Sequence, residues 1–429
     1  MRIARVCRPD VRTRLPSMVA GLVAALVVLA APAASGAATP SAVDHPQIAV
    51  GGFPTGIALN PLTHTIYVGN GTTGTLSLID GATCNAGDVA GCSQHVTAVT
   101  AGNDPIGIAV DQSTNTVYVV NFSGTVAVVN GRNCDAANTS GCKIEPATVR
   151  VGANPQFLAV DQKTDTIYVA NGGSDTVSVI DGRTCNAASR AGCRRVRASI
   201  PVGPGPFAVA VNDATRSIYI TDVGAKTISV LDGRTCNASD VRGCRHRPTV
   251  NVGETPGGIA VDTRTDTIYV TGESSDDVSV IDGKTCNALT TSGCRQKPVH
   301  VLAGLGARGI AVNEVTDTVY VANTVANTVS VINGAICNAT VHTGCGQQAA
   351  LASVGVSPRR VAVDELTNTV YVTNAGSNTV TMLDGRTCNG LVNKGCAPAG
   401  IPSGTTPPTT TPAPPPTTTG PFTARPRRP

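Results

Sequence analysis

Two cysteines separated by seven residues recur along this chain at a step of 50 or 51 residues. Seven such pairs occur, the first at Cys84 and Cys92 and the last at Cys388 and Cys396. The seven Tyr residues, which are all the Tyr of the protein, follow the same step. Self-similar units of this size indicate a propeller, a solenoid or a linear array, because one such unit cannot bury its apolar surface alone.

The unit that begins at Val151 shows the internal plan of the repeat. An apolar stretch ends at Asp161, TIYVAN spans 166–171, TVSVIDG spans 176–182, and RRVRASIPV follows the cysteine loop. Gly, Pro, Asn and Asp turns separate these stretches, so each unit is expected to form four short antiparallel strands. The chain has no Trp, and no stretch has the apolar spacing of a long helix. Sheets of this kind stack radially in propellers.

The two ends of the repeat array predict a closed ring. The seventh unit lacks a fourth strand after Cys396, whereas Gln47 to Val50 have the sequence of a fourth strand before the first unit. An N-terminal strand that completes the last blade would leave no sheet edge unpaired. The sequence therefore predicts an all-β fold over 47–398: a seven-bladed β-propeller of four-stranded antiparallel blades, with the N-terminal strand completing the last blade.

Residues 1–37 have the layout of a secretory signal peptide. Five Arg precede an uncharged stretch from Leu15 to Ala34, and small residues follow at 35–37. Residues 38–46 are a short N-terminal segment, and 399–429 form a Pro/Thr-rich tail that is expected to be a disordered linker. We expect a secreted or extracellular protein, at most loosely associated with the cell envelope. The apolar stretch is too short for a comfortable membrane span.

The cysteines of each unit are expected to pair with each other. Fourteen of the fifteen cysteines remain once Cys7 leaves with the leader, and an even count in an exported chain indicates disulfides. Zinc sites use shorter spacings and four converging ligands, so we expect no metal and no other cofactor. The expected disulfides are Cys84–Cys92, Cys134–Cys142, Cys185–Cys193, Cys236–Cys244, Cys286–Cys294, Cys337–Cys345 and Cys388–Cys396.

The second strand of every unit ends with a related tetrapeptide. Residues 371–374 read YVTN, and the other units have YVGN, YVVN, YVAN, YITD or YVTG. Over roughly 47–396 the chain resembles the YVTN-type β-propeller repeat family, which includes surface-layer proteins, lactonase-like propellers and an exported propeller that binds single-stranded DNA. The resemblance implies the fold and does not single out one of these functions. The cysteine pair in every repeat departs from the family pattern and favours an envelope or extracellular role.

The distribution of charge argues against nucleic acid as a partner. The five Arg and one Asp of the leader account for the whole formal excess of +4, and the tail holds three more Arg, so the propeller itself is slightly acidic. One basic cluster lies in the cysteine loops of units three and four, where no aromatic platform for bases accompanies it, and we expect it to be solvated. The cluster comprises Arg190, Arg194, Arg195, Arg197, Arg242, Arg245, His246 and Arg247.

Residues that break the repeat are the better candidates for function. The loops that precede the first strand and those that join strands two and three share one face, and the cysteine loops lie on the other. Phe residues of units one to four and Arg residues of the loops before units six and seven fall on the first face. Together they could hold an anionic, partly apolar ligand or a peptide; alternatively, the Phe fill gaps and the charges are solvated. The candidate ligand-binding residues are Phe53, Phe122, Phe157, Phe207, Arg308, Arg359 and Arg360.

The sequence gives little support for catalysis. None of the six His pairs recognisably with a Ser or Cys nucleophile, so no catalytic residue is assigned. We therefore expect an exported, non-enzymatic binding or scaffold module, a monomer whose partner is a protein, a peptide or an anionic envelope component. A lactonase-like hydrolase is the alternative, and a propeller that binds single-stranded nucleic acid is the third interpretation.

Overall fold

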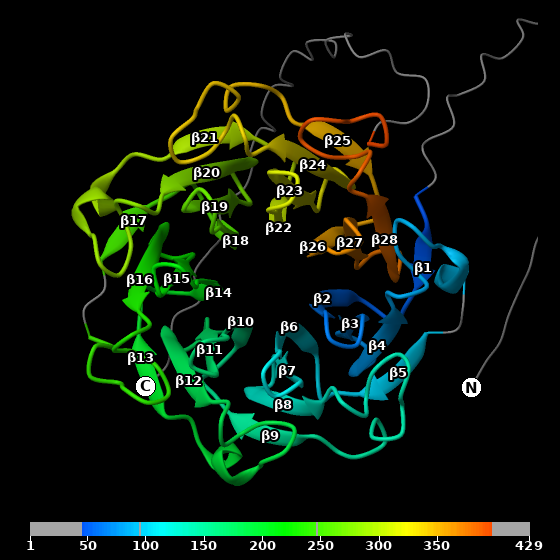
Figure 1. Cartoon of the computed structure of the whole chain (residues 1–429). Helices are drawn as coiled ribbons and strands as arrows, with labels where there is room; N and C mark the ends of the chain where they lie inside the picture. Colours follow the sequence, from blue (N-terminus) through cyan, green and yellow to red (C-terminus); the bar gives the residue numbers. More distant parts are fainter. Residues whose placement is uncertain (1–44, 94–95, 246–247, 397–429) are drawn as a thin grey trace, which may run out of the picture. The chain divides into compact units, whose positions relative to one another are not determined.

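The described part of the chain folds into seven four-stranded antiparallel sheets arranged as the blades of a propeller (Figure 1). The computed structural model describes residues 45–93, 96–245 and 248–396. The predicted fold class is confirmed. The leader predicted over 1–37 and the tail predicted over 399–429 lie outside the described residues.

Within each blade the strands follow one another from the centre of the ring outward (Figure 1). Blades one to three comprise β2 (Pro54–Asn60), β3 (Thr65–Asn70), β4 (Thr75–Asp80) and β5 (Thr97–Thr100); β6 (Pro105–Asp111), β7 (Thr116–Asn121), β8 (Thr125–Asn130) and β9 (Ala147–Arg150); and β10 (Pro155–Asp161), β11 (Thr166–Asn171), β12 (Thr176–Asp181) and β13 (Ala198–Pro201). Blades four to six comprise β14 (Pro206–Asn212), β15 (Ser217–Asp222), β16 (Thr227–Asp232) and β17 (Thr249–Asn251); β18 (Pro256–Asp262), β19 (Thr267–Gly272), β20 (Asp277–Asp282) and β21 (Val299–Leu302); and β22 (Ala307–Asn313), β23 (Thr318–Asn323), β24 (Thr328–Asn333) and β25 (Ala350–Ser353). Blade seven comprises β26 (Pro358–Asp364), β27 (Thr369–Asn374), β28 (Thr379–Asp384) and β1 (Gln47–Ala49).

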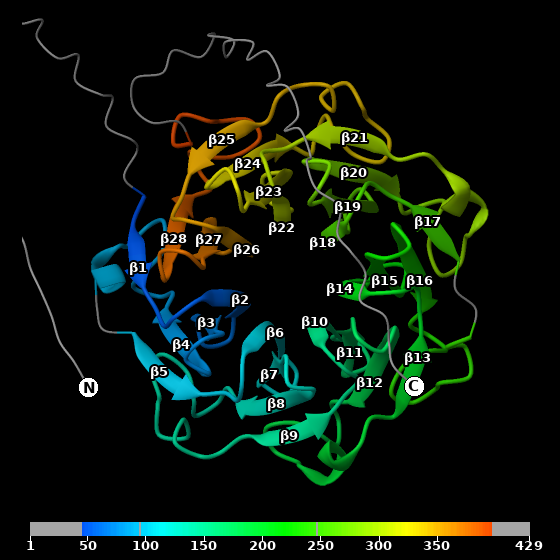
Figure 2. The ribbon, with the colours of Figure 1, turned by 180° about the vertical axis from the view of Figure 1, so that it is seen from behind.

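The ring is closed by the first strand of the chain, as predicted. β1 lies beside β28 in both views (Figures 1 and 2), and Ile48 pairs with Val380 in antiparallel register. The ladder continues beyond the strand, because the Val50 N–H donates to the Asn378 carbonyl at 3.0 Å. Ile48 is 1% exposed, so the strand also contributes to the core.

The hydrophobic core is divided into seven clusters, each lying between two neighbouring blades. Tyr118 and Val128 of blade two, for example, pack against Leu158 and Ile167 of blade three. The seventh cluster joins blade seven to blade one through Tyr371 and Ile66. Because each sheet is packed on both faces, its central strands carry apolar residues at consecutive positions, which is the pattern that the sequence shows.

Each of the seven Tyr joins its blade to the next one. The side chains are fully buried, and each hydroxyl donates to the carbonyl oxygen of the first cysteine in the following blade, at 2.6–3.0 Å. The last of these bonds runs from Tyr371 to Cys84 and therefore spans the closure of the ring. A single residue type per repeat thus fills the space between blades and bonds them together.

We expect the buried Tyr to make the propeller unfold cooperatively in alkali. Burial raises the pKa of all seven, that of Tyr219 from 10.0 to about 12. A group with a raised folded-state pKa contributes stability that is complete below its unfolded value and is lost as the pH rises towards the folded one. Unfolding should therefore begin above pH 10, with tyrosinate absorbance and loss of circular dichroism rising together. Tyrosinate that appears stepwise in a protein that stays folded would contradict the prediction.

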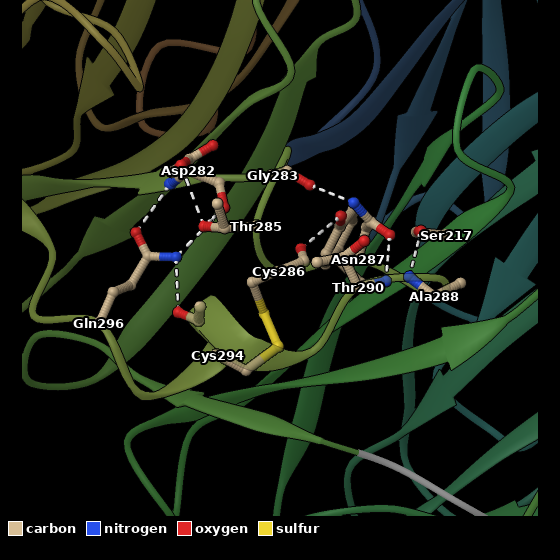
Figure 3. Close-up of a disulfide and its surroundings, with 12 residues drawn as sticks. Ser217, Asp282, Gly283, Thr285, Cys286, Asn287, Ala288, Thr290, Cys294 and Gln296 are labelled. Atoms are coloured by element: carbon tan, nitrogen blue, oxygen red, sulfur yellow. Dashed lines mark hydrogen bonds between the residues drawn. A yellow bond between two sulfur atoms is a disulfide. The ribbon is translucent and has the colours of Figure 1, made fainter.

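The cysteine loops complete the junctions between blades. All seven predicted disulfides form, each between cysteines eight positions apart. In blade five, the loop closed by Cys286–Cys294 is held by Asn287, whose side-chain amide donates to the Gly283 carbonyl at 2.7 Å (Figure 3). The Ala288 N–H then donates to the Ser217 hydroxyl of blade four at 2.8 Å (Figure 3). The equivalent bond occurs in every blade.

The described residues also include short helical turns that the sequence did not indicate. Three cysteine loops contain a 3-10 helix: η1 (Ala90–Ser93), η2 (Ala191–Arg194) and η3 (Ser292–Arg295). Each is a single turn around the second cysteine of a pair, too short to show an apolar period. No helix in the described part of the chain has the length and apolarity that a membrane span needs.

Candidate functional site

A pocket of about 180 Å³ lies on the face opposite the cysteine loops, where the innermost strands of five blades begin. Its walls come from blades one, two, three, six and seven. Six of the seven predicted ligand-binding residues line it, and Phe207 packs behind them, edge to face with Phe157 at 5.1 Å between ring centroids. We call it the Phe–Arg pocket. It is lined by Phe53, Thr55, Asp104, Ile106, Phe122, Gln156, Phe157, Arg308, Arg359 and Arg360.

A β-bulge near the start of the innermost strands brings consecutive side chains to this pocket. In β26, Pro358 pairs with Asn374 and Arg360 pairs with Thr373, so Arg359 is the extra residue of the bulged strand. Without the bulge, successive side chains of a strand point to opposite faces. Residues on both sides of the register shift therefore reach one pocket.

The placement of the arginines in loops was wrong. Arg308 lies within β22, and Arg359 and Arg360 lie within β26. The physical reason is again the bulge, because it allows strand pairing to begin at Ala307 and Pro358, ahead of the arginines. The arginines are consequently held by a sheet, which fixes their positions better than a loop would.

The arginines and phenylalanines meet across the axis of the ring. The Arg360 guanidinium lies 3.6 Å from the centroid of the Phe157 ring, although their blades, seven and three, are not neighbours. Arg308 of blade six likewise lies 5.4 Å from the Phe207 ring of blade four. Cation–π contacts of this kind contribute about 0.5–2 kcal/mol each. The aromatic and cationic halves predicted from the sequence therefore contact each other.

Only part of the positive charge in the pocket is neutralised. Arg308 forms an ion pair with Glu273 at 2.8 Å, and Arg360 donates from Nη1 to the Arg308 carbonyl at 3.2 Å. Arg359 Nε and Arg360 Nη2 are buried and have no hydrogen-bond partner among the described residues. Burial, followed by repulsion from Arg308, lowers the pKa of both arginines. Leaving a buried donor without a partner costs about 1–3 kcal/mol.

Phe53 occupies a backbone position that a bulky residue rarely takes. Its φ is +55°, in the left-handed region. The residue at this point has a positive φ in every blade, and in the other six it is Asp104, Asn154, Gly205, Thr255, Gly306 or Ser357. A Phe here therefore carries backbone strain in exchange for placing an aromatic ring, 39% exposed, at the pocket.

Asp104 was not among the predicted site residues. It lies on the exposed rim of the pocket, where partial burial raises the pKa of its carboxyl group. Its position in blade two is that of Phe53 in blade one, so superposing the seven repeats would have identified it. Thr55, Ile106 and Gln156 were also missed. They occupy the repeat position that holds Phe207, Arg308 and Arg359 in other blades, so the same superposition would have identified them.

Comparison with known proteins identifies the family. The sequence profile of a family described as lactonase, 7-bladed beta-propeller, matches residues 65–406. This chain belongs to that family. Among solved structures, hydrazine synthase from Kuenenia stuttgartiensis is similar, with a TM-score of 0.59 and 18% identity over 81% of this chain and 98% of that one. At this identity the likeness shows the fold alone. No curated protein sequence matches the chain.

The basic cluster of this lactonase-family propeller is partly engaged in local contacts on the cysteine-loop side. Arg242 pairs with Asp240 at 2.8 Å, and the Arg197 Nε donates to the Ala238 carbonyl at 3.0 Å. His246 and Arg247 lie outside the described residues. These contacts hold some of the guanidinium groups in place. Arg190 also lines a small pocket of about 70 Å³ beside the Cys134–Cys142 loop.

One His contacts a Ser, which the sequence did not indicate. His300 Nδ1 lies 3.0 Å from an Asp277 carboxylate oxygen and 3.4 Å from the Ser279 hydroxyl. A catalytic triad needs the Ser on one ring nitrogen and the carboxylate on the other. Here both face the same nitrogen, and Ser279 is 1% exposed. His300, Asp277 and Ser279 of this lactonase-family chain therefore lack the geometry that would activate Ser279 as a nucleophile.

Proposed function

We propose that this lactonase-family propeller is an exported, non-enzymatic binding module whose Phe–Arg pocket holds an organic anion. The observation that carries the proposal is the pair of arginines, Arg359 and Arg360, that line a pocket walled by phenylalanines and form no ion pair with a carboxylate among the described residues. Sites of this kind, mostly apolar with a few convergent polar groups, are typical of small-molecule binding. The anion is either a free molecule or a group on an envelope component.

Export is supported by two independent features. Residues 1–37 have the order of regions found in secretory leaders. The seven disulfides favour an oxidising compartment, because thiols stay reduced in the cytosol. We further assign the repeats to the YVTN type on their tetrapeptides, and the chain to a leader at 1–37, a short segment at 38–46, a propeller at 47–398 and a tail at 399–429.

Titration calorimetry with a panel of organic anions tests the proposed function. The panel contains octanoate, benzoate, phenyl phosphate and succinate. We expect at least one to bind, and the double variant Arg359→Gln/Arg360→Gln to weaken that binding about tenfold or more, because charge-assisted hydrogen bonds contribute about 1.5–3 kcal/mol each. Arg386→Gln is the matched control, since Arg386 is half-exposed and pairs with Asp384 on the cysteine-loop face. If no anion binds, or if the double variant binds as tightly as the wild type, the proposal is wrong.

Lactone hydrolysis is the second candidate function, and the family match favours it. Asp104 would accept a proton from water, whose oxygen would bond to the lactone carbonyl carbon while Arg359 and Arg360 stabilise the oxyanion. The ring carbon–oxygen bond would then break, and the ring oxygen would take the proton to give a hydroxy acid. The raised pKa of Asp104 suits a general base, which supports keeping this candidate.

The substitution Asp104→Asn separates the two candidates. Asn adopts a positive φ readily, as Asn154 does at the same point of blade three. If the pocket only binds anions, removing a negative charge from its rim should tighten benzoate binding about two- to fivefold. If Asp104 is a general base, proton release from δ-valerolactone in a pH-stat should fall about a hundredfold. Weaker benzoate binding together with lost turnover would overturn the binding proposal.

A further inference from the structure

We infer that the Phe–Arg pocket takes a single aromatic ring bearing one carboxylate, with the ring against Phe53 and Phe122 and the carboxylate shared between Arg359 and Arg360. This inference rests on the proposed function and narrows its organic anion to one chemical class. Four observations carry it: the size of the pocket, its charge, the adjacent positions of Arg359 and Arg360, and the exposed rings of Phe53 and Phe122.

The size of the pocket fits one six-membered ring. Its volume is about 180 Å³, and an apolar cavity of about 150 Å³ lined by Leu, Ile and Phe is known to hold benzene. A ring with one short polar substituent therefore fills the space. A long acyl chain or a sugar phosphate would extend beyond the walls and leave much of its surface outside.

The charge of the lining residues matches a monoanion. Glu273 neutralises Arg308 through an ion pair of 2.8 Å. Arg359 and Arg360 remain, opposed by the single carboxylate of Asp104 on the rim. The balance is one net positive charge, which one carboxylate offsets. A dianion such as a phosphate monoester would leave an unmatched negative charge beside Asp104, and like charges at such separations repel.

The two donors without partners come from adjacent residues on one bulged strand. The shift between Pro358 and Arg360 lets Arg359 and Arg360 serve the same pocket. A carboxylate has two oxygens, so it can accept a hydrogen bond from each of the two guanidinium groups that line the pocket. One small group would then serve as the counter-ion of both arginines.

The aromatic wall offers exposed rings for the body of the ligand. The Arg360 guanidinium lies 3.6 Å from the Phe157 ring centroid, and the Arg359 guanidinium lies 5.2 Å from that of Phe53. Phe53 and Phe122 nevertheless remain 39% and 40% exposed. Aromatic pairs prefer offset or edge-to-face contacts, which a ligand ring can adopt against both. The strained φ of +55° at Phe53 places its ring beside the Arg359 guanidinium at the pocket, where smaller residues stand in the other blades.

Calorimetry with four matched probes tests the inference. Benzoate has the ring and the charge, benzamide keeps the ring without the charge, hexanoate keeps the charge without the ring, and phenyl phosphate adds a second charge. We expect benzoate to bind about tenfold or more tightly than each of the others. Benzamide or hexanoate binding as tightly as benzoate would overturn the inference. If another anion binds through Arg359 and Arg360 and benzoate does not, the inference fails and the proposed function stands; if no anion binds, both fail.

A variant of Phe53 distinguishes a role of the ring in ligand binding from a role in the stability of the fold. Phe53→Asn introduces the residue type that blade three carries at this position and relieves the backbone strain. We expect it to weaken benzoate binding about fivefold while the thermal midpoint stays unchanged or rises. Arg386→Gln, on the opposite face, should leave the affinity for benzoate unchanged. Unchanged benzoate affinity in Phe53→Asn would show that the ring does not contact the ligand and would overturn this arrangement.

Discussion

Reduction of the seven disulfides is expected to unfold the propeller under conditions in which the oxidised protein stays folded. Each bridge closes a loop between cysteines eight positions apart, and closure of such a loop stabilises a fold by about 2.5 kcal/mol in the chain-entropy model. A folded domain has only about 5–15 kcal/mol of net stability. The loss of even a few of these contributions therefore exceeds what the fold has in reserve.

The effect should be larger than that of seven independent loops, because each loop also bonds to a neighbouring blade. The carbonyl of Cys236 accepts the Tyr168 hydroxyl at 2.6 Å, and the Ala238 N–H donates to Thr166 at 3.0 Å. A loop that opens on reduction loosens both bonds. Thermal unfolding followed by circular dichroism, with and without a phosphine reductant, measures the effect. The double variant Cys286→Ala/Cys294→Ala gives the contribution of one blade, and an unchanged midpoint after complete reduction would contradict the prediction.

Deletion of residues 45–49 should have the second largest effect on stability. The deletion removes Ile48 from the seventh core cluster and leaves β28 as an open edge. Loss of a buried Ile costs about 2–5 kcal/mol, and each lost backbone hydrogen bond adds about 1 kcal/mol. We expect a decrease of about 5 kcal/mol or more in the free energy of unfolding, measured by urea denaturation. The exposed edge should also promote association between molecules.

A peptide added in trans provides the control for this deletion. A synthetic peptide of residues 45–51 carries the register pairs Gln47–Thr381, Ile48–Val380 and Ala49–Thr379, so it should restore the urea midpoint of the deleted protein. A peptide with Ile48→Asp should not, because the side chain is buried in the native ring. A deleted protein with the wild-type midpoint would show that ring closure does not depend on β1.

The fold could be predicted from the sequence because its determinants are local and repeated. The Tyr and Cys positions recur with one step, and the missing fourth strand of the last unit has its counterpart at Gln47. The bonds between blades could not be predicted. That the Tyr371 hydroxyl reaches the Cys84 carbonyl depends on the distance between sheets, and no local pattern in one repeat encodes that distance.

The candidate site was predictable in composition and not in geometry. Phe157 and Arg360 stand out in the sequence because they interrupt a regular repeat. Nothing in the sequence indicates that the Arg360 guanidinium lies 3.6 Å from the centroid of the Phe157 ring, across the axis of the propeller. The ion pair of Arg308 with Glu273 decides which arginines remain available to a ligand, and it too depends on the curvature of the ring. Asp104 does not stand out by residue type, and only its position in the repeat, equivalent to that of Phe53, marks it.

A crystal structure of the protein grown with 4-bromobenzoate tests the central claim most directly. The anomalous signal of bromine locates the ligand without assumptions about the pocket. We expect one bromine position per molecule in the Phe–Arg pocket, with the carboxylate oxygens within hydrogen-bond distance of the Arg359 and Arg360 guanidinium groups. Bromine bound only elsewhere, or a pocket that stays empty at saturating ligand, would contradict the assignment of this pocket as a binding site for an aromatic carboxylate.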